Sequence, residues 1–93
     1  MSHPVVDVTG IELLGDHRVA LRFSDGERRE RDLSPLLTGP VFEDVRCDPA
    51  IFAGVAIDSD SGVLCWPSGV DVDAELLRYD DLWNETVALT RSA

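Results

Sequence analysis

Lysine is absent from this sequence. All eight basic residues are arginines, and 18 acidic residues outnumber them to give a formal net charge of −10. Six arginines stand against nine acids up to Arg46, and two against nine after it. Phosphate binding needs a basic surface, because affinity comes from neutralising phosphates and releasing counterions. The composition therefore argues against direct nucleic-acid binding and against an anionic membrane, and it favours a protein partner with a basic surface.

Long apolar runs and paired cysteines are also lacking. No stretch of about 18 apolar residues is present, so no transmembrane helix is expected. The start MSHPVVDVTG has neither the basic residues nor the apolar core of a secretory signal. Cys47 and Cys65 have no CxxC spacing, and we expect free thiols rather than a disulfide or a zinc site. A cytoplasmic protein is the resulting expectation.

Motifs for catalysis are missing as well. The sequence has no P-loop, no G-x-G-x-x-G and no G-x-S-x-G around Ser68. His3 and His17 stand in an expected tail and an expected turn, where neither is obviously presented to a serine or cysteine. We therefore expect no enzyme, no catalytic residue, no metal and no cofactor.

The first third of the chain predicts an antiparallel meander. Residues 5–14 are rich in β-branched side chains, and residues 18–24 alternate strictly between apolar and polar. Asp25-Gly26 then predicts a hairpin with a type I′ turn, which needs positive φ at both positions. Residues 27–33, ERRERDL, form the third strand. We expect this meander to bury one face only.

The third strand is almost entirely charged, which sets its place in the sheet. A strand this polar cannot have both faces covered, so we expect it near an edge or with one face in solvent. Its alternating signs suit cross-strand pairing with Arg18, Arg22, Glu12 or Asp7. It is also the only local concentration of arginine, which leaves two interpretations: a basic binding stripe, or a solvated face held by salt bridges. The second is favoured.

Short helices and a second hairpin are expected after the meander. After Leu33, Ser34 can cap a short helix that has Pro35 at its first position, and Asp48-Pro49 repeats this signal. Residues 54–58 and 63–66 read as two strands joined by an acidic loop.

The last part of the chain is expected to be helical. A helix begins near Ala74 after Asp73, with Asp71 or Asp73 as its cap. Apolar residues recur at three- and four-residue intervals within the C-terminal segment 78–93, which either docks on the core or contacts a partner. The fold class is thus α+β: one domain over residues 1–93, with a three-stranded N-terminal meander, a second hairpin and short helices after Leu33 and Asp73.

Two acidic segments raise the possibility of metal binding. Asp58-x-Asp60-x-Gly62 lacks the spacing of a calcium loop, which needs its glycine at position 6 and a glutamate at position 12. The segment 71–75, Asp-x-Asp-x-Glu, enters an expected helix, where acids favour the helix dipole without any ion. A small-molecule or divalent-metal-binding domain that uses these segments with Trp66 is the alternative function.

The stretch CWPSGVDVD combines an aromatic, chain breakers and acids in nine positions. Pro67 ends strand pairing and Gly69 permits a turn, so the corner has a structural explanation. Packing of Trp66 over the core is the favoured interpretation. The candidate partner surface, in case the ring is exposed, comprises Trp66, Pro67, Gly69 and Asp71.

Several short motifs occur together in a fixed order. They are F-x-D-G at residues 23–26, D-L-x-P-L-L at 32–37, G-P-V-F at 39–42 and W-P-x-G-x-D at 66–71. In this combination the chain resembles the small bacterial domain-of-unknown-function family twenty-four forty-two, whose fold is named after the N-terminal domain of a nitrosomonad protein. The resemblance covers residues 5–77. It implies a small α+β fold with an antiparallel sheet and short helices.

The resemblance implies no established activity and no catalytic residue. Some relatives are encoded beside a small partner in suspected toxin–antitoxin pairs, and others carry an appended helix-turn-helix. This chain departs at Ser68, where the family usually has asparagine, and at Ala74, where it often has proline. The residues after Leu77 are too few for a DNA-binding module, so any DNA role is expected to come through a partner.

These observations lead to one functional expectation. A small acidic chain without catalytic motifs is expected to be a protein–protein interaction module, and the resemblance suggests the antitoxin-like member of a gene pair. A homodimer through the charged third strand or the C-terminal helix is a further expectation.

Overall fold

The computed structural model describes residues 3–92, with side chains for residues 3–89. The strands are β1 (Val8–Gly15), β2 (Arg18–Phe23), β3 (Arg28–Asp32), β4 (Ala56–Ile57), β5 (Leu64–Cys65) and β6 (Asp71–Val72). The 3-10 helices are η1 (Ser34–Leu36) and η2 (Pro40–Phe42), and the α-helices are α1 (Glu43–Cys47), α2 (Pro49–Ala53), α3 (Ala74–Arg78) and α4 (Asp80–Ser92). The strands form two antiparallel three-stranded sheets, which confirms the α+β fold class.

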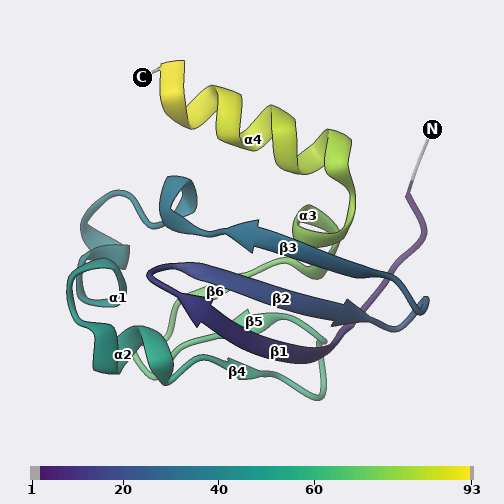
Figure 1. Ribbon diagram of the computed structural model, residues 1–93, viewed down its shortest axis with the longest axis horizontal. Helices are drawn as coiled ribbons and strands as arrows, with labels where there is room; N and C mark the ends of the chain where they lie inside the picture. The colour runs from purple at the N-terminus through teal and green to yellow at the C-terminus, as the bar shows by residue number, and fades with distance from the viewer. Residues whose placement is uncertain (1–2, 93) are drawn as a thin grey trace.

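The first sheet is the predicted meander, in the order β1-β2-β3. Its central strand has the predicted alternation, because Val19, Leu21 and Phe23 are each at most 3% exposed. They face the second sheet's Leu64 and the helices in one continuous core. Figure 1 shows the second sheet beneath the first, with α4 running past the β3 edge.

The turn between β2 and β3 differs from the prediction. A type I′ turn was expected at Asp25-Gly26, but only Gly26 has positive φ, at +88°. The N–H of Gly26 donates to the Phe23 carbonyl (2.9 Å), and the N–H of Phe23 donates to Glu27 (3.0 Å). This is the three-residue hairpin loop, in which a turn is followed by one left-handed glycine. Asp25 has a different task, because its side chain accepts from the Glu27 N–H and from Arg78.

The second sheet contains a strand that sequence patterns did not predict. β4 and β5 form the expected hairpin, and β6 adds to β5 through the pairs Leu64–Val72 and Cys65–Asp71. Asp71 is therefore a strand residue rather than a helix cap. Asp73 stands at the N-cap of α3, but its side chain makes no capping hydrogen bond. A two-residue strand is too short for its alternation to be recognised in the sequence. β6 is defined here by its pairing with β5.

The helical caps are partly as predicted. Asp48 caps α2, because its carboxylate accepts from the Ala50 N–H at 2.9 Å. Ser34, expected as a cap, is instead the first residue of η1. The N-cap of η1 is Leu33, one residue earlier than predicted, and the Asp32 carboxylate accepts from the Ser34 N–H (3.0 Å) in a local turn.

The C-terminal segment docks on the body of the protein. It forms α4, whose Trp83 is 8% exposed and belongs to the core. The expected segment 78–93 reaches one residue beyond the described part of the chain. Among the described residues, no helix is both long and apolar enough to cross a membrane. Of the two options considered from sequence, docking on the core is the one observed for this helix.

A glycine ties the acidic loop to the start of β1. Gly62 has φ +70°, its carbonyl accepts from the Val8 N–H (2.8 Å), and an added Cβ would overlap the Asp7 side chain. Gly62→Ala is therefore expected to cost the left-handed conformational penalty of about 1–2 kcal/mol plus the displacement of Asp7. Gly26→Ala, with φ +88° but open space around its Cβ position, is the matched control. Urea unfolding should show the larger loss for Gly62→Ala, and equal losses would contradict the overlap.

Candidate functional site

The tryptophan corner is a packed structural turn. Trp66 is 3% exposed, and its indole N–H donates to the Phe52 carbonyl at 3.0 Å. The backbone closes on itself after this residue: the N–H of Trp66 donates to Val70, and the N–H of Gly69 donates back to Trp66. Packing of the ring, the favoured interpretation, is what the structure has. The indole is fully used inside the protein and presents no face to a partner.

The structure separates the residues of the candidate partner surface. Trp66 is buried, whereas Pro67, Gly69 and Asp71 are exposed. Pro67 packs near Gly54, where an added Cβ would lie 3.3 Å from its ring. The Trp66 ring is therefore not part of an exposed surface. Asp71 alone lines a hollow.

That hollow is an apolar groove with an acidic rim. It has a volume of about 290 Å³ and lies between η1–η2, β6 and α3. We call it the acidic groove, and it is lined by Leu36, Phe42, Asp71, Val72, Asp73 and Leu76. Leu36, Phe42 and Leu76 are half-buried and pack against the core from its margin. They come from η1, η2 and α3, so their gathering around one hollow follows from tertiary packing and not from local sequence.

The rim of the acidic groove carries unbalanced charge. In the part of the chain that the structure describes, the Asp71 and Asp73 carboxylates have neither an ion pair nor a hydrogen bond. Val41, next to Phe42, is 68% exposed and extends the apolar surface. An apolar strip beside two uncompensated carboxylates is complementary to an apolar side chain flanked by cations.

The arginines of β3 form ion pairs within the protein. Arg31 is only 10% exposed. It donates to the Leu77 carbonyl (2.8 Å) and to Asp80 (2.7 Å), and its guanidinium lies 5.2 Å from the centre of the Trp83 ring. Arg29 also reaches Asp80, at 3.3 Å. The salt-bridged interpretation of this strand is therefore the one observed, and its partners include residues of helices α3 and α4 as well as Arg18 on the neighbouring strand β2.

Asp80 is the acid that joins β3 to α4. The hydrogen bond from Arg31, together with the charges of Arg31 and Arg29, lowers the pKa of Asp80 below its usual value of 3.8. A lowered folded-state pKa means that the charged form stabilises the fold above the unfolded pKa, and that this contribution is lost as pH falls through the folded value. Because the Asp80 side chain is 62% exposed, solvent screening keeps the contribution below about 1 kcal/mol.

Asp80→Asn should therefore lower the free energy of unfolding modestly at pH 7, and the deficit should persist down to about pH 4. Below that, wild type should lose its advantage as Asp80 is protonated, so the two proteins converge. Urea unfolding between pH 7 and pH 2.5 checks this. Added salt at pH 7 should shrink the difference, since the pair is exposed. A difference that stayed constant at low pH would contradict the role of the charge.

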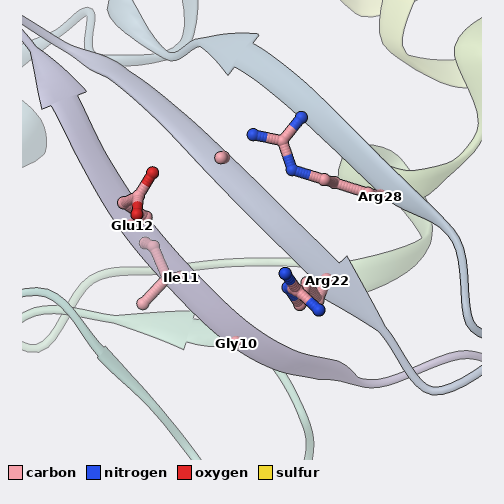
Figure 2. A pocket seen from close by; sticks show the side chains of 6 residues that line it. Gly10, Ile11, Glu12, Arg22 and Arg28 are labelled. Atoms are coloured by element: carbon pink, nitrogen blue, oxygen red, sulfur yellow. The ribbon is translucent and has the colours of Figure 1, made fainter.

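The outer face of the first sheet holds two arginines side by side. Arg22 on β2 lies directly opposite Arg28 on β3, and both line a hollow of about 290 Å³ with Glu12 (Figure 2). Arg28 pairs with Glu30 at 3.0 Å, and Arg18 reaches the same acid at 3.6 Å.

The cross-strand pairing expected here is only partly present. Arg18 does pair across to Glu30, but within the described residues Arg22, Glu12 and Asp7 form no ion pair. The sheet register explains this, because it places Arg22 against Gly10 on one side and against Arg28 on the other.

The loop at 58–62 is a hydrogen-bonded turn. The Asp58 carboxylate accepts from the Asp60 N–H at 2.9 Å, and this bond lowers the pKa of Asp58. Over the residues whose positions are described, no three of the histidine, cysteine, aspartate and glutamate side chains cluster as metal ligands would. Cys47 and Cys65 are both free thiols.

Comparison with known proteins places the chain in a family. The model of the family described as "Protein of unknown function (DUF2442)" matches residues 8–81, which include both sheets and α3. No curated protein matches, and no solved structure matches. The chain therefore belongs to the DUF2442 family of proteins of unknown function.

Proposed function

We propose that this protein is a protein–protein interaction module that docks a partner in the acidic groove. The observation that carries the proposal is the rim: Asp71 and Asp73 stand uncompensated beside half-buried Leu36, Phe42 and Leu76. Exposed apolar surface rimmed by polar residues is typical of protein contact sites. The partner that fits is a segment with an apolar anchor side chain flanked by arginine or lysine.

Net charge supports the same kind of partner. At −10 the whole chain attracts a basic protein and accelerates its encounter, while the groove supplies the apolar contact that holds it. Among the partners that family context implies, the small product of a neighbouring gene is the first to test. In that pairing this chain would be the antitoxin-like member.

A non-catalytic, cytoplasmic role is part of the proposal. His3 is hydrogen bonded to Asp81 and His17 to the Arg46 carbonyl, and over the described residues neither is hydrogen bonded to a serine or cysteine. The exposed free thiol of Cys47 suits a reducing compartment. The engagement of Arg29 and Arg31 with Asp80 leaves little free basic surface for phosphates.

Co-expression with the neighbouring gene product tests this proposal. The double reversal Asp71→Lys with Asp73→Lys should weaken the complex by about tenfold or more, because it puts two cations where the partner's cations dock. The control is Glu12→Lys with Asp60→Lys. It changes the net charge equally, and it lies on residues that are exposed and outside the groove.

The comparison separates a specific site from general electrostatics. Isothermal titration with the purified partner should show the loss for the groove variant and near wild-type binding for the control. Equal weakening by both variants would mean that net charge alone drives association. A neighbouring product that binds neither wild type nor variants would overturn the pairing.

A further inference from the structure

A third hollow, about twice the volume of the acidic groove, is lined by the β1–β2 turn and the first two α-helices. Its volume is about 560 Å³, which is within the range of small-molecule sites. Its lining residues come from β1, the β1–β2 turn, α1 and α2, elements whose arrangement Figure 1 shows, and the apolar ones are Leu13, Pro49, Phe52 and Ala53. Leu13 is 44% exposed, so an apolar surface is available to a ligand there.

Two opposite charges line the same hollow without meeting each other. Arg46 donates one hydrogen bond, to the Leu37 carbonyl at 2.8 Å, and its remaining N–H groups have no acid partner within the described chain. Asp16 also lines the hollow, and over the same residues its carboxylate has no hydrogen bond or ion pair. Among the described residues, the hollow is thus lined by one cation and one anion that have no ion-pair partner, together with apolar side chains.

The imidazole ring of His17 is a third polar group that lines the hollow, and its orientation is fixed by its contacts. Its Nε2 lies 3.1 Å from the Arg46 carbonyl, and a carbonyl only accepts, so Nε2 carries the hydrogen. In the neutral ring Nδ1 is therefore an acceptor. The ring is held edge-on to Phe52, with centroids 4.9 Å apart, and its orientation is set before any ligand arrives.

We propose that this hollow binds a free α-amino acid with a large apolar side chain. The ligand's carboxylate pairs with Arg46, its ammonium group with Asp16, and its side chain covers the exposed surface of Leu13, Pro49 and Ala53. A ligand with only a carboxylate would meet the Asp16 charge, and one with only an ammonium would meet Arg46. A zwitterion satisfies both. This site is separate from the acidic groove and does not depend on the function proposed for it.

The test is a titration of ¹⁵N-labelled protein with L-phenylalanine, 3-phenylpropionate and 2-phenylethylamine, followed by amide chemical shifts. L-phenylalanine should cause saturable shifts at Asp16, His17 and Ala53. Each analogue lacks one charge and should bind about tenfold or more weakly. Absence of shifts with L-phenylalanine at millimolar concentration, or equal binding of either analogue, would overturn the proposal.

Two variants assign the charges. Arg46→Gln should weaken L-phenylalanine binding by about tenfold or more. Asp16→Asn should do the same, and asparagine is among the residues best suited to the φ of +49° found at this position. Arg22→Gln, which removes an arginine from the outer face of the first sheet, should leave binding unchanged. If Arg46→Gln fails to fold, Asp16→Asn still decides, and unchanged binding in it would overturn the assignment.

Discussion

Replacing Trp66 with alanine is expected to lower the free energy of unfolding by about 3–5 kcal/mol. The indole is almost entirely buried, and it contacts the Phe52 ring, with centroids 6.1 Å apart. Its removal leaves a cavity between the second sheet and α2 and deprives the Phe52 carbonyl of a donor. For a chain of this length each kcal/mol is worth roughly 4–8 °C, so the melting temperature should fall by more than about 12 °C.

Trp66→Phe separates packing from the hydrogen bond. Phenylalanine keeps most of the apolar contact and loses the indole N–H, so this variant should recover a large part of the loss. The Phe52 carbonyl keeps the hydrogen bond from the Val55 N–H (3.2 Å), so the remaining deficit should be about 0.5–1.5 kcal/mol, the net contribution of one hydrogen bond. Urea unfolding of wild type, Trp66→Ala and Trp66→Phe gives the contributions of packing and of the hydrogen bond to the free energy of unfolding. An alanine variant within 1 kcal/mol of wild type would contradict the central packing role of Trp66.

Replacing Trp83 with alanine should detach the C-terminal helix. Among the α4 side chains that the structure describes, Trp83 is the one buried in the core, and the Arg31 guanidinium lies over its ring. An isolated helix of this length is marginal in water, so without its anchor α4 is expected to lose helicity. The free energy of unfolding should fall by about 3 kcal/mol. Circular dichroism at 222 nm and amide exchange within α4 measure the two effects.

Leu89 offers the matched control for that experiment. It lies on the same helix but is 68% exposed, so Leu89→Ala should change stability by no more than about 0.5 kcal/mol and leave α4 helical. Arg31 also donates to Asp80 and to the Leu77 carbonyl of α3. In Trp83→Ala the Arg31 side chain should therefore remain ordered only if α3 stays docked. Retention of full helicity in Trp83→Ala would mean that these polar contacts, rather than the tryptophan, hold the tail.

Most of the fold could be predicted from the two-residue alternation of apolar side chains and from strong local signals. The alternation of Val19, Leu21 and Phe23 predicted the buried face of β2, since successive strand residues point to opposite faces. Asp48-Pro49 predicted the start of α2 through a cap that depends on neighbouring residues alone. These features hold because their cause is local in the chain.

Errors arose where the outcome depended on distant segments. The Asp25-Gly26 pair suits two hairpin turns, and the choice between them is coupled to Arg78, which ties Asp25 from 53 residues away. Asp71 reads as a helix cap in isolation, and only the presence of β5 beside it makes a strand. Short elements of this kind owe their existence to pairing, which the local sequence does not encode.

Residue counts alone determined the net charge and the lack of lysine. The period of the apolar residues along the chain determined the small α+β class. Tertiary structure alone decided which side chains are free. It buried Trp66, joined Arg31 to Asp80 and Trp83, and left Asp71 with Asp73 in the groove and Arg46 with Asp16 in the hollow without ionic partners among the described residues. Whether a charge is paired depends on which residues lie within about 4 Å in space, and folding brings them there from any distance along the chain.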